Sequence, residues 1–352
     1  MEATRTAFPY AGLPAERVWR RAVSALPADR VDPQGARAGW RFDRRTAIAS
    51  AGSCFAARIA ERLRSAGYNY LTLEPGAAYS AAYGDVTTAL QLLQLAQRAA
   101  GSFRPSEPPW VRDGRYVDPF RPLATAAGFA SVAALEADRT RHLAAVRRML
   151  SEAEVLVFTL GLTETWCTRA DGAALPLCPG ASVGTFDPAR YVYRNLSVAE
   201  NVAALEAFLD IARALNPGLR LVLTVSPIPL AATMEPRHVL QASTYSKSVL
   251  RVAAETVRES RERVDYFAAY EIVASACLGL DAYAANRRDV NDDAVDRVMR
   301  SFFEAYAQPE PEAAAPATFT LTLEAVDARA AAMSYDADPC TENRLASCLD
   351  AG

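Results

Sequence analysis

Five short apolar segments alternate with amphipathic segments along the chain. The apolar segments predict strands at Thr46–Ala51, Tyr68–Leu73, Val155–Leu160, Leu219–Val225 and Val264–Phe267. Segments with helical periodicity follow them, over 55–64, 86–99, 133–150, 198–214, 245–261 and 293–306. This alternation predicts an α/β fold, a three-layer α/β/α sandwich around a five-stranded parallel sheet.

The alternating region spans residues 46–306 and is predicted to form one domain. Residues 1–45 are polar and interrupted by prolines, and they contain one predicted helix around Glu16 to Leu26. We expect them to form an extension packed on the domain. Residues 307–352 are rich in alanine and proline and predict a linker and a weakly ordered tail.

Composition narrows the class of protein. A hydrophobic content of 51% and a net charge of −3 are typical of a soluble globular protein and give no electrostatic reason to bind nucleic acid or an anionic membrane. The first residues hold no apolar stretch of signal-peptide length, and no apolar run is long enough for a membrane span, so a cytoplasmic location is expected. With only two histidines and no regular cysteine spacing, we expect no metal site, no cofactor and no disulfide framework.

Polar residues follow each predicted strand, where ligands bind in parallel sheets. They comprise Ser53 and Cys54 after the first strand, Gly84 after the second, Gly161 to Glu164 after the third, Ser226 and His238 after the fourth, and Glu271 after the fifth. Their convergence at one edge of the sheet predicts an enzyme active site.

The segment Gly52–Ala56 places a Ser-Cys pair at a strand-to-helix turn. The first amides of a helix are exposed there, and the helix dipole favours a thiolate and lowers the pKa of a cysteine. A small buried cysteine at a glycine turn is the alternative interpretation. The polar residues at the other strand ends favour a nucleophile.

Several motifs resemble the GSCFA family, whose name is the sequence of Gly52–Ala56. The others are Thr159–Trp166, Thr224–Pro227, Ser246–Lys247 and Tyr266–Glu271, and the resemblance runs from about residue 8 to residue 306. The family is grouped with the SGNH/GDSL hydrolases, which implies a flavodoxin-like fold and acyl-group chemistry.

The SGNH motifs imply roles for particular positions of this chain, and at some of these positions the chain has a different residue. Cys54 stands where that pattern has its nucleophilic serine, and Thr163 replaces the asparagine of the GxND motif at 161–164. Gly84 is the expected backbone donor to an oxyanion, with Gly76 as the second choice. The DxxH motif matches Asn286–Asp289, which lacks the histidine.

A proton donor or base is therefore sought elsewhere. Our hypothesis is a constellation of Cys54, His238 and Glu271, in which Glu271 orients the imidazole. A solvated His238 at a helix start is an equal alternative. Asp289 is the alternative candidate for the base, or it could bind a cationic substrate. The other interpretation is that its loop only caps the last helix. His142 is predicted to lie on the surface.

Further residues are expected to touch substrate. Arg121 could pair with a substrate carboxylate or phosphate, although an internal ion pair is the simpler interpretation. Gly161, Glu164 and Ser226 complete the expected binding edge. Lys247 either binds substrate or only begins its helix.

These features predict an acyl-transfer enzyme: an esterase, thioesterase or O-/N-acyltransferase that forms an acyl-enzyme on Cys54. The expected partner is a small-molecule, glycan or carrier-bound acyl substrate. One alternative keeps the fold but uses Ser53 as the nucleophile of a serine esterase. The other is a catalytically silent module that binds a glycan or a carrier.

Overall fold

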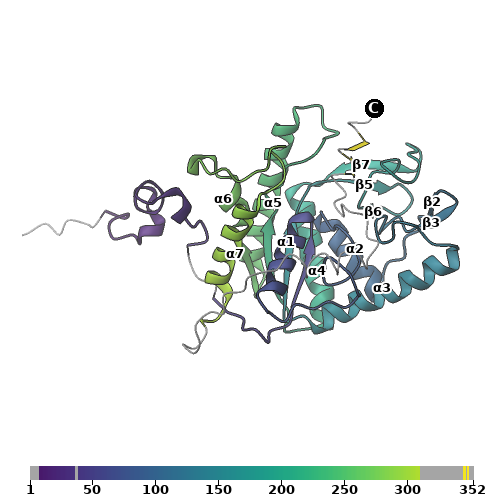
Figure 1. Ribbon diagram of the computed structural model, residues 1–352, viewed down its shortest axis with the longest axis horizontal. Helices are drawn as coiled ribbons and strands as arrows, with labels where there is room; N and C mark the ends of the chain where they lie inside the picture. Colours follow the sequence, from purple (N-terminus) through teal and green to yellow (C-terminus); the bar gives the residue numbers. More distant parts are fainter. Residues whose placement is uncertain (1–7, 36–38, 310–343, 346, 349–352) are drawn as a thin grey trace, which may run out of the picture.

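The computed structural model describes residues 8–35, 39–309, 344–345 and 347–348. Its central sheet has four parallel strands in the order β1 (Ile48–Gly52), β4 (Val155–Leu160), β8 (Arg220–Val225) and β9 (Val264–Phe267). The strand-helix alternation is thus confirmed as a parallel α/β fold (Figure 1).

The expected second strand contributes only a bridge beside β1. Tyr70 bridges Ile48 in parallel, and the Leu71 amide donates to the Ile48 carbonyl at 2.8 Å. The pairing stops there because the Leu73 amide donates instead to Ser80, within its own loop. The prediction of five full strands was therefore wrong by one strand in the described residues.

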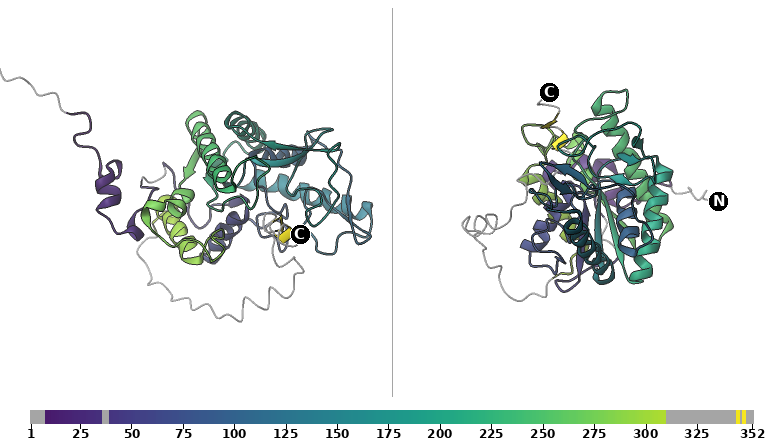
Figure 2. Two further views of the ribbon diagram at one scale, coloured as in Figure 1. Left: turned by 90° about the horizontal axis from the view of Figure 1, so that it is seen from above. Right: turned by 90° about the vertical axis from the view of Figure 1, so that its right-hand side faces the viewer.

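Helices cover both faces of the sheet, because successive strand residues point to opposite sides. On one side α1 (Cys54–Ser65), α6 (Ala269–Ala274) and α7 (Asp292–Tyr306) pack against Ile48, Val155 and Val157. On the other, Ala49, Leu156 and Phe158 contact a layer made of α2 (Ala89–Ala100), α3 (Val132–Glu152), α4 (Val198–Leu215) and α5 (Val239–Ser260). Figure 2 shows these helices around the sheet.

Two small antiparallel elements were not predicted. β5 (Glu164–Thr168) pairs with both β6 (Ala174–Leu175) and β7 (Tyr191–Asn195), and β2 (Trp110–Arg112) forms a hairpin with β3 (Arg115–Val117). They share a separate apolar cluster that includes Trp110, Leu175 and Tyr191. Because β5 begins soon after β4 ends, this sheet lies beyond the carboxyl end of the parallel sheet.

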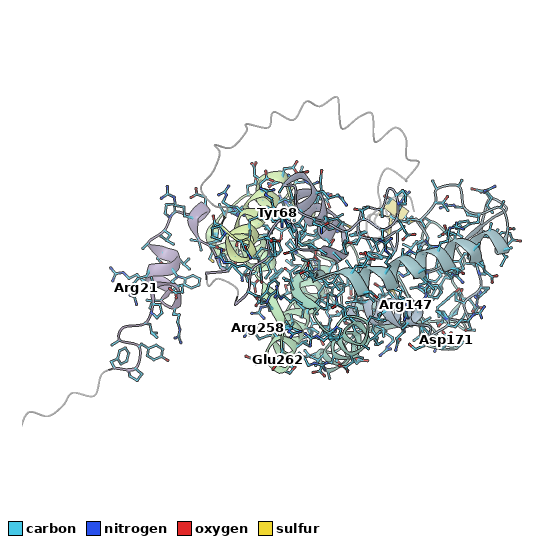
Figure 3. All side chains as sticks on the ribbon, turned by 90° about the horizontal axis from the view of Figure 1, so that it is seen from below. Arg21, Tyr68, Arg147, Asp171, Arg258 and Glu262 are labelled. Carbon is cyan, nitrogen blue, oxygen red and sulfur yellow. The ribbon has the colours of Figure 1, made fainter. Side chains whose placement is uncertain are left out.

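The N-terminal segment contains only short helical turns where a continuous helix was predicted. These are η1 (Ala15–Arg17), η2 (Arg20–Ser24) and η3 (Ala28–Arg30), and Phe8, Tyr10 and Trp19 are exposed. The segment around Arg21 stands away from the body in Figure 3. Close packing begins with the buried Val31 and with Asp32, whose carboxylate accepts a hydrogen bond from Ser301.

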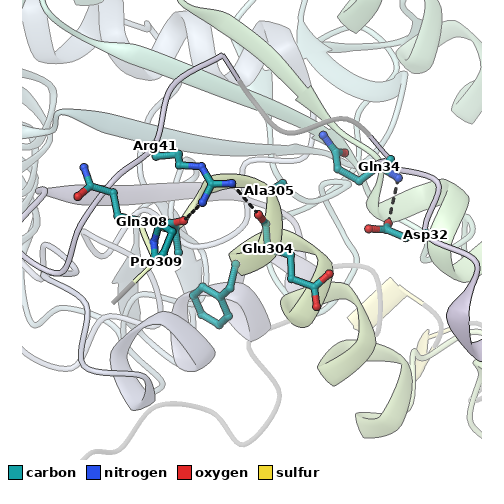
Figure 4. Close-up of a pocket in the computed structure, with 10 residues that line it drawn as sticks. Asp32, Gln34, Arg41, Glu304, Ala305, Gln308 and Pro309 are labelled. Atoms are coloured by element: carbon teal, nitrogen blue, oxygen red, sulfur yellow. Dashed lines mark hydrogen bonds between the residues drawn. The ribbon is translucent and has the colours of Figure 1, made fainter. Parts of the chain in front are cut away.

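The chain then runs along the end of α7. Arg41 donates to the Ala307 carbonyl at 2.7 Å and borders a hollow of about 480 Å³ (Figure 4). None of the strand-end residues lines this hollow. The predicted linker and tail lie mostly outside the described residues, but residues 344–345 and 347–348 are helical, and Leu345 packs against the third apolar cluster. No helix in the described ranges is long and apolar enough to cross a membrane.

Candidate active site

The strand-to-helix turn after β1 is built on Gly52. Its φ is +148°, and a Cβ at this position would lie 2.7 Å from both the Cβ and the carbonyl oxygen of Thr159 on β4. Ser53 occupies the N-cap position of α1, and Cys54 begins the helix. Only glycine lets the two backbones approach this closely, so Gly52 fixes where Cys54 lies.

The loop after Tyr83 closes over the same turn. The Val86 amide donates to the Gly52 carbonyl at 2.9 Å. The Thr87 carbonyl accepts from the amides of Gly161 and Leu162, at 2.8 and 3.0 Å. Three segments, one after β1, one before α2 and one after β4, therefore meet at the carboxyl edge of the sheet.

Asp85 approaches Cys54 at this meeting point. Its Oδ2 lies 3.7 Å from Cys54 Sγ, and its Oδ1 accepts a hydrogen bond from the Tyr79 hydroxyl at 2.5 Å. Burial, together with the adjacent Asp85 charge, holds the pKa of Tyr79 well above its usual range, so Tyr79 remains a donor. Sequence reasoning missed Asp85, although it follows the expected donor Gly84 directly.

The two residues of the Ser-Cys pair have different environments. Cys54 is half-buried, and in the structure it is disulfide-bonded, so its sulfur is available as a nucleophile only in the reduced protein. Ser53 is 4% exposed, and its Oγ is buried without a hydrogen bond in the described part of the chain. Cys54 is thus the more accessible of the two.

Gly84 lies beside Asp85 in the left-handed region. Its φ is +72°, and a Cβ added to it would meet nothing within 4 Å. Open space therefore adjoins the Gly84 Cα, one residue before Asp85. This position is compatible with the expected role of the Gly84 amide as an oxyanion donor.

Thr163 and Lys247 form a buried link between the β4 turn and α5. The amide and the hydroxyl of Thr163 both donate to Ser246 Oγ at 3.1 Å, and Lys247 Nζ donates to the Gly161 carbonyl at 2.6 Å. Thr163 is fully buried. Its hydroxyl is therefore engaged in positioning the turn and does not face a bound substrate.

Two other residues of the expected binding edge also have protein partners. Glu164 accepts hydrogen bonds from the Thr233 hydroxyl at 2.6 Å and from the Met234 amide at 3.3 Å. Ser226 is buried, and its Oγ accepts from the Ile228 amide at 3.3 Å. Ser226 therefore shapes the turn after β8, whereas Glu164 lies on the wall of an apolar pocket.

The structure does not bring the side chains of the hypothesised constellation together. His238 is exposed, and its Nδ1 accepts from the Leu240 amide at 3.2 Å as the N-cap of α5. Glu271 bonds Arg251 and the Tyr266 hydroxyl, at 3.0 and 2.8 Å. Both groups serve local structure, because each is held by neighbours on or beside its own element.

Asp289 belongs to a turn that precedes α7. Its carboxylate accepts from Asn286 Nδ2 at 2.8 Å, and its amide donates to Asn286 Oδ1 at 3.0 Å. The neighbouring Arg288 donates to the Pro229 carbonyl at 3.2 Å. This turn is tied to the loop after β8, and the N-cap of α7 is Asn291.

The prediction that His142 lies on the surface was wrong. The imidazole is fully buried on α3, and its Nδ1 lies 2.8 Å from Glu74 Oε2. Glu74 Oε2 also accepts from the Ala82 amide at 2.7 Å. His142 therefore anchors the loop that carries Tyr79, Gly84 and Asp85.

Arg121 lies in a buried ion-pair network beside His142. It donates to Asp118 at 3.2 Å and to Asp138 at 2.6 Å, and Arg139 also bonds Asp118. Burial alone would raise the pKa of Asp118, but the hydrogen bond from Arg139 and the charges of both arginines lower it to about 2. The internal ion pair is thus the role that the structure gives Arg121.

Metal coordination is not indicated in the part of the chain that the structure describes, where no group of three or more His, Cys, Asp or Glu side chains is placed to hold an ion. The fold and the site define a parallel α/β protein with a cysteine at the first strand-to-helix turn. The chain belongs to the GSCFA family, whose model matches residues 47–302.

A search of curated proteins finds no match. Among solved structures, the chain is similar to a carbohydrate esterase family 3 protein from Talaromyces cellulolyticus. The identity is 12% and the TM-score 0.32, with 73% of this chain and 94% of that chain covered. It is also similar to a protein from Streptococcus pneumonia provisionally described as a platelet activating factor. That identity is 11% and the TM-score 0.27, with 45% of this chain and 65% of that chain covered. With both TM-scores below 0.5, these likenesses carry no argument about activity.

Proposed function

We propose that this protein is an acyl-transfer enzyme in which reduced Cys54 is the nucleophile and Asp85 is the general base. The observation that carries the proposal is the 3.7 Å approach of the Asp85 carboxylate to Cys54 Sγ. Asp85 takes the role that the sequence assigned to His238. An ester or a thioester is the expected donor.

The first half-reaction forms the acyl-enzyme. Asp85 accepts the Cys54 thiol proton while the sulfur attacks the carbonyl carbon, and the carbonyl oxygen becomes an oxyanion. The amides of Cys54 and Gly84 bind this oxygen, and such donors are worth roughly 2.7–4 kcal/mol of barrier each. When the tetrahedral intermediate collapses, the leaving group takes the proton from Asp85 and departs as an alcohol or thiol.

The second half-reaction releases the acyl group. Water, or an acceptor hydroxyl or amine, gives its proton to Asp85 and attacks the thioester carbonyl carbon. The bond to sulfur then breaks, and Asp85 returns the proton to the thiolate. The same two residues therefore serve hydrolysis and transfer, and the acceptor decides between them.

Local electrostatics support a reactive sulfur at this position. Cys54 is the first residue of α1, where helix-end amides and the dipole favour negative charge. The Lys247 ammonium is bonded to Gly161 in the adjoining turn. Asp85 is 3% exposed, and its Oδ1 accepts from the Tyr79 hydroxyl, so its carboxylate is held in place beside the sulfur.

The strand order also supports placing this family with the SGNH hydrolases. With the Tyr70 bridge counted as the second strand, the order becomes 2-1-3-4-5, as in flavodoxin-like sheets. In such folds the ligand binds beyond the carboxyl ends of the strands, where Cys54 and Asp85 lie.

The test is intact-mass measurement of the reduced full-length protein after incubation with activated esters and acyl thioesters. Wild type is compared with Cys54→Ala and with the matched neighbour Ser53→Ala. We expect one acyl adduct on wild type and Ser53→Ala, and none on Cys54→Ala.

Two results would overturn the proposal. An adduct that persists in Cys54→Ala and is lost in Ser53→Ala would assign the chemistry to a serine esterase. Absence of any adduct and of any turnover would favour the silent binding module.

A further inference from the structure

An apolar pocket of about 250 Å³ lies against the antiparallel sheet, beyond the end of β4. Its walls come from β5 and β6, from the loop after β8 and from the described C-terminal residues. The apolar side chains that line it include Leu162, Trp166, Leu175, Leu177, Leu230 and Leu345.

The pocket adjoins the segments that form the candidate active site. Thr87 and Leu162 line it, and these two residues are joined by the 3.0 Å hydrogen bond from the Leu162 amide to the Thr87 carbonyl. Gly161, the next residue toward the site, would place a Cβ 3.2 Å from Ser53 Cβ and 3.3 Å from Thr87 Cβ. An acyl chain in this pocket would therefore have its first carbons beside the turn that carries Cys54.

The polar groups of the pocket have protein partners. The Glu164 carboxylate is bonded to Thr233 and Met234, and Gln91 Nε2 donates to the Leu175 carbonyl at 2.9 Å. Burial and the nearby Glu164 raise the pKa of Tyr193, so its hydroxyl remains neutral. An anionic occupant would meet the Glu164 carboxylate and no cation among the described lining residues, and it would lose its hydration, whereas an apolar chain would lose nothing.

We infer that this pocket holds the acyl chain of the substrate, a chain of medium length such as octanoyl. The inference rests on the proposed function, because the chain must be attached to the carbonyl that Cys54 attacks. The pocket volume lies just below the range of about 300–1,000 Å³ for pockets that hold drug-sized ligands, and it suits one chain of medium length.

A larger side chain at Ala232, in the loop after β8, would fill the pocket. Ala232 lines the pocket and Ala231 does not, although both are half-exposed neighbours, so Ala231→Phe is the matched control for Ala232→Phe. In the reduced full-length protein, kcat/KM is measured with acetyl, butyryl and octanoyl thioesters, and sodium octanoate binding is measured by calorimetry.

We expect wild type to prefer octanoyl and to bind octanoate. Ala232→Phe should lower kcat/KM for octanoyl at least about tenfold and change the value for acetyl by less than about twofold, since each methylene in an apolar pocket is worth about 10–200-fold. Ala231→Phe should behave as wild type.

The inference is wrong if Ala232→Phe lowers all three substrates equally, if Ala231→Phe has the same effect, or if wild type neither prefers octanoyl nor binds octanoate. Failure of the proposed function can be distinguished from failure of this inference, because octanoate binding needs no turnover. Binding that Ala232→Phe abolishes, in a protein that cleaves no ester, would keep the apolar ligand class and reject the enzyme.

Discussion

The contact between Asp85 and Cys54 gives the first prediction at the residue scale. Asp85→Asn keeps the shape of the side chain but removes the base, and we expect kcat of the reduced enzyme to fall about 10²–10⁴-fold. Tyr79→Phe removes a hydrogen bond that favours the charged carboxylate. It should therefore raise the pKa of Asp85 and move the acidic limb of the pH–rate profile upward. An unchanged limb in Tyr79→Phe, or full activity in Asp85→Asn, would reject Asp85 as the base.

Gly52 gives a second prediction at this scale, because two different constraints act on it. Its φ is positive, and the Thr159 backbone occupies the space of a Cβ. Gly101, at the C-terminus of α2, also has a positive φ of +80° but has open space around it. We expect Gly101→Ala to cost about 1–2 kcal/mol of unfolding free energy and Gly52→Ala to cost clearly more. Urea unfolding measures both, and equal costs would show that the close approach to Thr159 is unimportant.

At the scale of elements, α5 fixes the turn after β4. Ser246 Oγ accepts both hydrogen bonds of Thr163, so Ser246→Ala leaves two buried donors unsatisfied. Each such group costs about 1–3 kcal/mol, and the turn that carries Gly161 should shift, which lowers kcat/KM as well. Ser248→Ala is the control, since Ser248 is exposed on the same helix and its hydroxyl donates to the Thr244 carbonyl. Equal stability and activity of the two variants would contradict this role for α5.

Elements with strong internal patterns could be predicted from sequence, and elements defined by their partners could not. The apolar run Val155–Leu160 forms β4 with the predicted bounds, because burial on both faces needs no knowledge of neighbours. The strands β5, β6 and β7 have only two to five residues each, and their pairing is decided by one another. Their positions therefore leave little trace in the local pattern.

In the candidate site, too, one part could be predicted from the sequence and another could not. The predicted strand-to-helix turn is present, and Cys54 is the first residue of α1, one position before the predicted start of the helix. Asp85 is brought to Cys54 by the long-range bond from Val86 to Gly52, which no local periodicity reveals. His238 was assigned to the same edge by chain order, yet its ring caps α5. Chain order therefore identifies the edge of the sheet, but the direction of each side chain depends on packing.

At the scale of the whole molecule, a buried polar and aromatic layer joins α3 to the active-site loop. The rings of Tyr79 and Tyr83 stack at 5.6 Å, and Tyr83 meets His142 edge-on at 6.3 Å. Glu74 connects His142 to the Ala82 amide. The position of Asp85 thus depends on the His142 imidazole, which lies on α3 and outside the loop that carries Asp85.

This dependence predicts how stability changes with pH. Burial lowers the pKa of His142 below 6.5, and the nearby charges of Arg121 and Arg98 act in the same direction, against the opposing effect of Glu74. The unfolded chain therefore binds more protons than the folded protein once the pH falls below about 6.5. The stability that neutral His142 provides is present above that pH and is lost as the pH falls toward the lowered pKa.

The measurement is the free energy of unfolding by urea from about pH 8 to pH 5. Wild type should lose up to about 1.4 kcal/mol per pH unit below pH 6.5 from this group, and His142→Gln should lack that component because its amide does not titrate. Burial would raise the pKa of Glu74, the carboxylate that faces His142, but the hydrogen bonds from His142 and the Ala82 amide, with the charge that His142 gains at low pH, hold it below its usual range. Glu74 therefore takes up its proton only at more acidic pH. His238→Gln removes the exposed imidazole and controls for the loss of a histidine elsewhere. If wild type and His142→Gln lose stability in parallel as the pH falls, the buried imidazole does not couple the active-site loop to pH.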